Sequence, residues 1–359
     1  MNVSWQFEYY FDECLRQVFL YLTDSCNLHC KQCLYKIFLK RSMEIDVGIA
    51  IRMLKKFYYF GARKLTLIGG EPTLYDKSNG NRNLFRLIEV AKNLGYEYIR
   101  MDTNGQFHST FFNNKSVFLL DEISFSLDGY SSSINDAVRG DGAFRRCLQN
   151  IERSICVGLK THITSCVHSL CVKSGNGIGY LNSFVDFASN IGVSTVNFHP
   201  VIKVGISRDA WIDSVDISPR IWLNMYRDFA PFVDVFGGVH VRMPQRFIER
   251  EVYEQNKNKY QYCPVKLRER LLVFPDGDIK VCSFQIGQSK RVAYYTDSCI
   301  QWERACDNNE ILSCEVKGAG GCCIQNVGDS ELVPLCMSFK PGQSEFVWNS
   351  LVDNEIVCA

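Results

Sequence analysis

Long hydrophobic runs and an excess of charge of either sign are absent from this sequence. No run of eighteen apolar residues occurs, so we expect no membrane-spanning helix. The formal net charge is only +1, which argues against a nucleic-acid partner, because neutralising phosphates requires an excess of Lys and Arg. Residues 1–13 are aromatic and acidic rather than basic and then apolar, so no secretory signal is expected. Together these absences predict a cytoplasmic globular protein.

Cysteine, by contrast, is abundant, with 17 in 359 residues. Two uses of so many thiols compete: a disulfide framework in a secreted protein, or thiolate ligands for metal in a reduced one. The chain length, the odd number of cysteines and the missing signal favour metal ligation. Disulfide-dense proteins are mostly small secreted domains with poor hydrophobic cores.

Three of the thiols, Cys26, Cys30 and Cys33, lie within eight residues directly after the apolar run Val18 to Leu22. A four-iron cluster takes one ligand on each iron, so three neighbouring thiolates leave the fourth iron open for chemistry. The spacing C-x3-C-x2-C resembles the signature of the radical S-adenosylmethionine (SAM) superfamily. This resemblance implies a [4Fe-4S] cluster whose open iron is chelated by the methionine amine and carboxylate of SAM.

Strand-like and helix-like segments alternate along the first 200 residues. Six strand-like segments are expected, with helical segments between them, at 17–23, 64–69, 96–103, 122–127, 159–167 and 195–201. This alternation predicts an α/β fold with a parallel sheet covered by helices, closed into a full or partial barrel. The superfamily's open six-unit barrel agrees with that number. We therefore expect an N-terminal extension at 1–15, a partial (β/α)6 barrel at 16–236 and a Cys-rich domain at 237–359.

Polar and glycine-rich turns follow the predicted strands, where parallel barrels place their reactive groups. After the second strand comes Gly69-Gly70-Glu71-Pro72, whose glycines allow a close backbone approach and whose acid can accept from an ammonium group. The resemblance implies that this turn binds the SAM amine and that Arg139 binds the SAM carboxylate. It also places Ser126 beside that carboxylate, with Asn104 and Asp128 lining the site. Ordinary turns and a solvated helix-entry charge are the competing interpretations.

One position near the predicted cofactor departs from the family pattern, and one nearby thiol is a candidate catalytic residue. The family usually has an aromatic residue or His before the third Cys, packed on the adenine, whereas this chain has Gln32, whose amide can hydrogen-bond a base edge. On the fifth strand, His162 and Cys166 are an even number of residues apart and are expected on one face. A thiol above the cofactor would be a competent hydrogen-atom donor, as an epimerase needs, so Cys166 is a candidate catalytic residue. Buried thiols and hydrogen-bonded imidazoles are the alternative.

The C-terminal region carries nine of the cysteines in its last 97 residues. A β-hairpin is predicted from Leu271 to Ser283, with a glycine at its turn. The arrangement Cys263-x13-Gly277-x4-Cys282 resembles the opening of the SPASM and twitch domains, which carry auxiliary iron–sulfur clusters. Its continuation is degenerate, because Ala319 stands where a Cys belongs. We therefore expect a twitch-like domain with one auxiliary [4Fe-4S] cluster, its ligands drawn from Cys263, Cys282, Cys322 or Cys323, and Cys336 or Cys314; a zinc site is the alternative.

The resemblance implies an enzyme that cleaves SAM reductively to a 5′-deoxyadenosyl radical, with an electron donor of the flavodoxin or ferredoxin type. The expected reaction is oxidative modification or cross-linking of a peptide or protein side chain. A dehydrogenase or epimerase of a small polar natural product, such as a sugar or aminocyclitol, and a non-catalytic iron–sulfur or zinc protein are the alternatives. Only 25 residues precede Cys26, whereas many peptide maturases carry a leader-binding domain there. We therefore expect recognition through the barrel mouth, the C-terminal region or a separate carrier.

Overall fold

The structure is a computed structural model, and part of the chain is described in it. The described residues are 15–173, 177–201, 215–229, 234–236, 238–244, 246–256, 269–283, 286, 291–297, 299–302 and 331–335.

The described strands are β1 (Gln17–Tyr21), β2 (Lys64–Ile68), β3 (Tyr98–Thr103), β4 (Glu122–Ser126), β5 (Thr161–Val167), β6 (Thr195–Pro200), β7 (Asp234–Phe236), β8 (Val239–Arg242), β9 (Phe247–Glu249), β10 (Arg270–Val273), β11 (Asp278–Lys280), β12 (Ala293–Tyr295), β13 (Ile300–Trp302) and β14 (Leu332–Pro334). The α-helices are α2 (Val47–Tyr59), α3 (Arg82–Leu94), α4 (Ser132–Arg139), α5 (Ala143–Cys156), α6 (Ser169–Lys173), α7 (Gly177–Asn190), α9 (Pro219–Phe229) and α10 (Arg250–Gln255). Short 3-10 turns cover Pro72–Leu74, Lys77–Asn79, Ser109–Asn113 and Lys115–Leu119.

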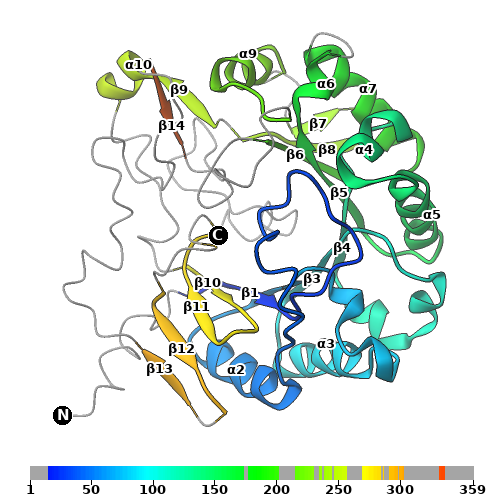
Figure 1. Cartoon of the computed structure of the whole chain (residues 1–359), viewed down its shortest axis with the longest axis vertical. Helices are drawn as coiled ribbons and strands as arrows, with labels where there is room; N and C mark the ends of the chain where they lie inside the picture. Colours follow the sequence, from blue (N-terminus) through cyan, green and yellow to red (C-terminus); the bar gives the residue numbers. More distant parts are fainter. Residues whose placement is uncertain are drawn as a thin grey trace.

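The main sheet confirms the predicted α/β partial barrel and extends it. Strands β1 to β6 pair in sequence order and in parallel, and β10 adds in parallel beside β1 while β8 adds in parallel beside β6. Antiparallel partners then continue each edge, namely β11 to β13 on one side and β7 on the other. Figure 1 shows helices α2, α3, α5 and α7 as an outer layer around this arc of strands.

Side chains alternate along the parallel strands between an apolar outer face and a polar inner face. On β3, Ile99 and Met101 are fully buried in the core under the helices, whereas Arg100 and Asp102 form an ion pair on the other face. The same alternation places Glu122 of β4 next to His162 of β5. Parallel strands buried on both faces are usually apolar throughout, so the polar inner face marks the barrel interior as a place for a polar ligand.

The covering helices follow from local sequence. Helix α2 begins after Asp46, whose side chain accepts a hydrogen bond of 2.9 Å from the N–H of Ile49 and satisfies one of the free donors of the first turn. Its buried side chains recur at helical spacing and pack on the sheet, namely Ile49, Ala50, Met53, Leu54 and Phe57. The core therefore lies between the sheet and this outer layer.

Two helices differ from what the sequence predicts. The sequence predicts an amphipathic helix from Ser218 to Asp234, whereas helix α9 is described from Pro219 to Phe229 and Asp234 begins β7. Helix α4 was not anticipated, although it carries Arg139 at its last position.

The predicted hairpin is present as β10 and β11, with Gly277 at a φ of +96° in its turn. Both β8 and β10 lie beyond residue 236, yet both extend the barrel sheet. No helix in the described part of the chain is long and apolar enough to cross a membrane.

Candidate active site

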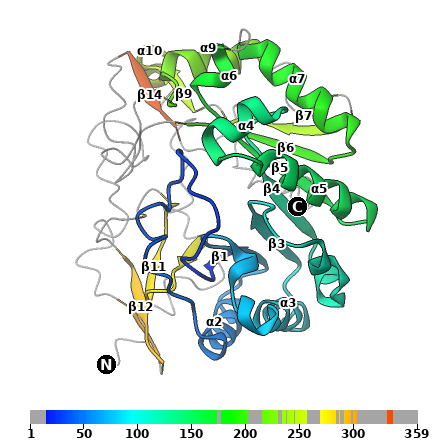
Figure 2. The ribbon, with the colours of Figure 1, turned by 45° about the vertical axis from the view of Figure 1, so that its right-hand side comes forward.

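The loop after β1 carries the three clustered cysteines across the mouth of the barrel, beside the β10–β11 hairpin (Figure 2). Cys30 is buried, Cys26 and Cys33 are half-buried, and all three are free thiols. N–H donors surround the sulfurs: Cys26 Sγ accepts from the Leu28 N–H and from Asn104 Nδ2, at 3.5 Å each. Arg139 Nη1 lies 3.9 Å from Cys30 Sγ. Such donors stabilise thiolate and tune the potential of iron–sulfur clusters.

The chemistry of this trio fits a cluster better than a single ion. Burial raises the pKa of Cys26 to about 11 and that of Cys33 to about 12, so a bound cation is needed to make them thiolates at neutral pH. No three His, Cys, Asp or Glu of the described residues are arranged to hold a metal ion. Zinc would need every thiolate about 2.3 Å from one centre, whereas the thiolates of a four-iron cluster bind different irons and stay farther apart.

The glycines after β2 are required because the cluster loop packs directly against their backbone. A Cβ on Gly69 would lie 2.6 Å from the carbonyl oxygen of Thr23, and one on Gly70 would lie 2.3 Å from that of Ser25. The backbones are joined there, because the Gly70 N–H donates to Thr23 and the Glu71 N–H donates to Ser25. Only glycine permits this approach, so the turn positions the cysteine loop whatever else it binds.

Glu71 is fully buried, and both of its carboxylate oxygens accept hydrogen bonds from protein groups. Oε1 accepts from the Thr73 N–H, the Thr73 hydroxyl and the Thr103 hydroxyl, while Oε2 accepts from the Asn104 N–H at 2.7 Å. A carboxylate offers about four acceptor sites. Glu71 therefore ties the turn after β2 to the end of β3, and its predicted contact with the SAM amine remains a prediction.

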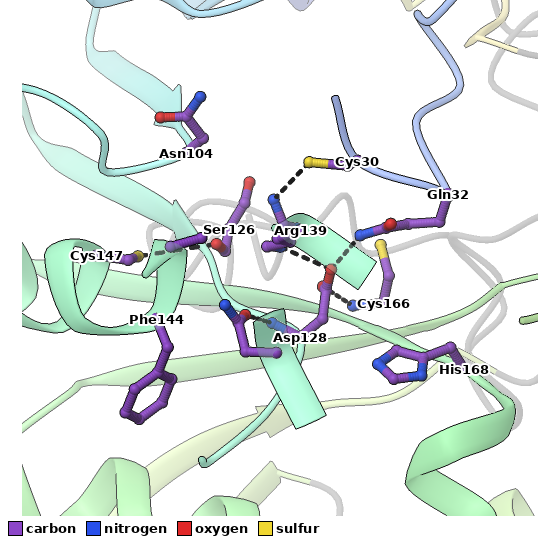
Figure 3. A network of polar contacts seen from close by, with 12 residues as sticks. Cys30, Gln32, Asn104, Ser126, Asp128, Arg139, Phe144, Cys147, Cys166 and His168 are labelled. Carbon is purple, nitrogen blue, oxygen red and sulfur yellow. Dashed lines mark hydrogen bonds and ion pairs between the residues drawn. The ribbon is translucent and has the colours of Figure 1, made fainter. Parts of the chain in front are cut away.

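Asp128 lies at the centre of a second network of polar contacts, as Figure 3 shows. Its carboxylate pairs with Arg139 Nε at 2.7 Å, accepts the Cys166 N–H at 2.7 Å and accepts from the Gln32 amide. The side chain of Asp128 is completely buried and that of Arg139 is 9% exposed. One carboxylate thus joins the cluster loop, α4 and β5.

Arg139 is a buried, oriented cation and not a solvated helix-entry charge. It closes α4, and burial acts against its charge, but the Asp128 carboxylate and the Cys30 sulfur raise its pKa further. With Nε on Asp128 and Nη1 near Cys30, its remaining Nη2 can meet an anion. Asn135 was not identified as a site residue from the sequence. Its side-chain oxygen accepts a hydrogen bond of 2.9 Å from the Asp128 N–H and so anchors α4 beside this site.

The other predicted residues lie around this network. Asn104 joins Cys26 to Asn27, since its Nδ2 also donates to Asn27 Oδ1 at 2.8 Å. Ser126 ends β4 near Arg139 in Figure 3, and its carbonyl accepts from the Cys147 thiol at 3.8 Å. Pro72 begins the 3-10 turn after Glu71.

Cys166 lies on β5 beside Gln32 and Asp128 (Figure 3). Burial raises the pKa of this thiol, so it keeps its hydrogen at neutral pH. That is compatible with the predicted hydrogen-atom donor, which remains a prediction. His162 lies deeper on the same strand, where its Nδ1 is 3.3 Å from Glu122.

The hairpin packs against the cluster loop through a cluster of aromatic side chains. Phe274 stacks on Tyr21 with ring centroids 4.4 Å apart, and Tyr35 packs on Tyr21 at 5.1 Å. Arg41 adds an ionic link, pairing with buried Asp24 at 2.9 Å and with Asp276 of the hairpin turn at 2.7 Å. Cys282, a predicted auxiliary ligand, is buried just after β11. Its predicted partners Cys263, Cys314, Cys322, Cys323 and Cys336 lie outside the described residues.

Comparisons with known proteins agree with this geometry. Residues 20–174 match the model of the Radical SAM superfamily. A relative from Saccharolobus solfataricus, "Probable GTP 3′,8-cyclase", is 26% identical over 279 residues, covering 74% of this chain and 81% of that protein. A protein of the same name from Saccharolobus islandicus is 26% identical over 196 residues, covering 55% of this chain and 60% of that protein.

Two solved structures share the fold at low sequence identity. Streptococcus suis SuiB has a TM-score of 0.57 at 16% identity, covering 77% of this chain and 62% of that one. The structure described as native anSMEcpe with bound AdoMet and Cp18Cys peptide also has a TM-score of 0.57 at 16% identity, covering 78% and 77%. The chain thus spans about three fifths of SuiB and of the S. islandicus relative.

Proposed function

Because this chain belongs to the radical SAM superfamily of enzymes, which use SAM and a [4Fe-4S] cluster, we propose that it oxidatively modifies or cross-links a side chain of a peptide or protein. The observation that best supports radical chemistry is the contact of Arg139 with both Asp128 and the Cys30 sulfur. When bound and reduced by one electron, SAM supplies a 5′-deoxyadenosyl radical that takes hydrogen from an unactivated carbon. The roles of the chain's own residues follow from their contacts.

Cys26, Cys30 and Cys33 would hold three irons, and Arg139 would bind the SAM carboxylate through Nη2. Asp128 fixes the orientation of Arg139, since an acid on Nε leaves only one end of the guanidinium free. Gln32, buried and held by Asp128, has an Oε1 without a hydrogen-bond partner among the described residues. That carbonyl oxygen is the atom we assign to the adenine amino group.

The barrel interior supports a polar substrate of low net charge. In its described part Arg100 is paired with Asp102, and the charge of Arg242 is offset by the nearby Glu122. Positive charge there is therefore largely balanced. A triphosphate would need unpaired cations, whereas a peptide side chain would not. The peptides named in the solved structures belong to those proteins, and they support the same substrate class here only through the shared fold.

A nucleotide substrate is the second candidate. The observation that favours it is the 26% identity to the Saccharolobus solfataricus relative named "Probable GTP 3′,8-cyclase" over about three quarters of the chain. Among small polar substrates, a nucleotide therefore has more direct support than a sugar or an aminocyclitol. A purely non-catalytic role is excluded by membership of this enzyme superfamily.

The first experiment measures 5′-deoxyadenosine after anaerobic reconstitution with iron, sulfide, SAM and dithionite. We expect release from the natural chain and none from Cys26→Ala, whereas Cys156→Ala, an exposed thiol on α5, serves as the matched control. Release that persists in Cys26→Ala would refute the cluster assignment.

The second experiment adds either GTP or a short peptide encoded beside the gene. Mass spectrometry of a peptide substrate should show the loss of two hydrogen atoms for each modification. A cyclised nucleotide, with the peptide unchanged, would establish the second candidate and overturn the first.

A further inference from the structure

The imidazole of His199 lies near the carboxyl end of β6, on the inner face of the barrel. Side chains alternate along this strand. Val196 and Phe198 belong to the core on the outer face, and the Phe198 ring meets that of Phe184 of α7 with centroids 5.4 Å apart. Asn197 and His199 take the other positions and therefore face inward.

His199 is the cross-strand neighbour of Cys166. The two residues are paired in the parallel register of β5 and β6, so their backbones lie about 5 Å apart and their side chains share the inner face. The Cys166 N–H is bound to Asp128, whose carboxylate holds Arg139, the residue predicted to bind the SAM carboxylate. His199 therefore borders the place where SAM and the substrate would meet.

Polar side chains that lie deeper on the same inner face contact groups of β4. His162 Nδ1 lies 3.3 Å from the Glu122 carboxylate, and the Thr164 hydroxyl lies 3.1 Å from that of Ser124. In the register of β5 and β6, His199 lies beyond these pairs, toward the barrel mouth. Its imidazole is thus placed where a substrate would enter.

One ring nitrogen of His199 is engaged and the other is not. Asn197 Nδ2 lies 2.7 Å from Nε2, and because an amide nitrogen only donates, Nε2 accepts and the proton of the neutral ring is on Nδ1. Nδ1 is shielded from water and has no hydrogen-bond partner among the described residues. A buried donor without an acceptor is unfavourable, and a ligand oxygen that accepts from it relieves this.

The imidazole of His199 carries no charge at neutral pH. Burial, and then the nearby charge of Arg246, lower its pKa to about 3. Arg246 is itself fully buried and donates to the Leu335 carbonyl. A neutral ring with its proton on Nδ1 offers one hydrogen bond and no positive charge, so it suits a carbonyl oxygen better than a phosphate or a carboxylate.

We propose that His199 binds the substrate, with its Nδ1–H donating to an amide carbonyl oxygen of the peptide beside the carbon that loses hydrogen. This inference rests on the proposed peptide-modifying function and names one contact within it. His199 makes and breaks no covalent bond. Guanine carries a carbonyl oxygen as well, so a nucleotide would present the same chemistry, and the experiment separates the two sources.

The test measures KM and kcat of the reconstituted holoenzyme for the peptide encoded beside the gene, and 5′-deoxyadenosine release under dithionite without peptide. In His199→Leu we expect KM to rise about tenfold, because a buried hydrogen bond to the substrate is lost, while kcat changes less than about threefold. Release without peptide should equal that of the natural chain. His199→Gln, whose amide can still donate, should recover most of the affinity.

Two further variants complete the series. Asn197→Ala frees Nε2 and lets the proton move between the two ring nitrogens, so KM should rise about threefold. This variant tests the contact independently if His199→Leu does not fold. His240→Leu is the matched control, because this half-buried imidazole pairs with Thr195 at the other end of β6 and should leave KM unchanged.

The remaining outcomes count against the proposal in different ways. An unchanged KM in His199→Leu and Asn197→Ala, with lower stability in urea, assigns His199 a structural role and leaves the proposed function standing. A natural chain that cyclises GTP, with a KM for GTP that rises in His199→Leu, assigns the donor to a nucleobase and overturns the peptide contact. Failure of the natural chain to modify the peptide refutes the proposed function, and this contact with it.

Discussion

At the scale of single residues, Asp128 shows how one buried acid organises a site. Its two oxygens engage Gln32, Arg139 and the Cys166 N–H, which belong to three different elements. Its own backbone is also used, because the Asp128 carbonyl accepts from the Tyr180 hydroxyl at 3.0 Å. The residue therefore fixes the cation predicted to bind SAM and the strand that carries Cys166.

Substituting Asp128→Asn should be severe. It leaves the Arg139 charge buried without a counter-charge, a change that typically lowers the free energy of unfolding by about 3–5 kcal/mol. We expect urea unfolding to show that loss and calorimetry to show at least tenfold weaker SAM binding. Asp186→Asn, an exposed acid on α7, is the control and should change neither quantity appreciably. Normal SAM affinity in Asp128→Asn would contradict the assignment of Arg139.

His162 makes stability depend on pH. Its side chain is fully buried, and burial lowers its pKa although the Glu122 carboxylate opposes this. The folded imidazole stays neutral while the unfolded one takes up a proton near its ordinary pKa of about 6.5. The stabilisation is therefore complete above that pH and is lost as the pH falls below it.

The variant His162→Gln should flatten this dependence. Below pH 6.5 the natural chain is expected to lose up to about 1.4 kcal/mol of unfolding free energy per pH unit from this group, and the variant should not. Chemical unfolding of both proteins at pH 8 and pH 5.5 measures the difference. Equal pH dependence in the two proteins would show that the group does not titrate as inferred.

At the scale of elements, the cluster loop depends on a hairpin that lies more than 200 residues away in sequence. The Tyr35 hydroxyl and Arg41 both bind buried Asp24, and Arg41 also reaches Asp276 at the hairpin turn. The guanidinium of Arg41 additionally lies 4.1 Å from the centre of the Phe38 ring. The hairpin thus supports the loop that holds the cysteines.

Replacing Arg41→Ala should loosen that loop. Asp24 would lose its cation while staying buried, and we expect the free energy of unfolding to fall by about 2–4 kcal/mol, with reduced iron content after reconstitution. Arg291→Ala is the matched control, since its pair with Asp278 on the same hairpin is exposed and should contribute less than about 1 kcal/mol. A larger effect in Arg291→Ala would argue against this coupling.

At the scale of the whole molecule, one sheet unites the barrel with the strands that follow it. Because β10 lies directly beside β1, the Cys-rich region begins within the barrel sheet, next to the strand that leads into the cluster loop. Burial of Tyr21 under Phe274 keeps water from that side of the loop. Excluding water and rival hydrogen donors is what radical chemistry requires of a protein.

The predicted auxiliary cluster is tested by counting iron. Two clusters imply about eight irons per chain and one implies about four. We expect the higher number in the natural chain, and a loss of about four irons when Cys26, Cys30 and Cys33 are all replaced by Ala. Four irons with bound zinc in the natural chain would support the zinc alternative for the C-terminal cysteines.

The sequence alone determined the class of this protein, because its strongest signals are local. The three cysteines need only one loop, and the alternation of strands and helices needs only hydrophobic periodicity. The expected fold class and six parallel strands were therefore confirmed. The site residues were nominated but their roles were not, since a role depends on neighbours.

Tertiary structure alone decided those neighbours. The Asp128–Arg139 pair, the four donors on Glu71 and the contact of Arg41 with the hairpin all join residues from different elements. Each contact is set by how helices and strands pack, which no spacing in the chain encodes. Helix α4 went unpredicted for the same reason: its short amphipathic pattern gains its stability from packing beside the site.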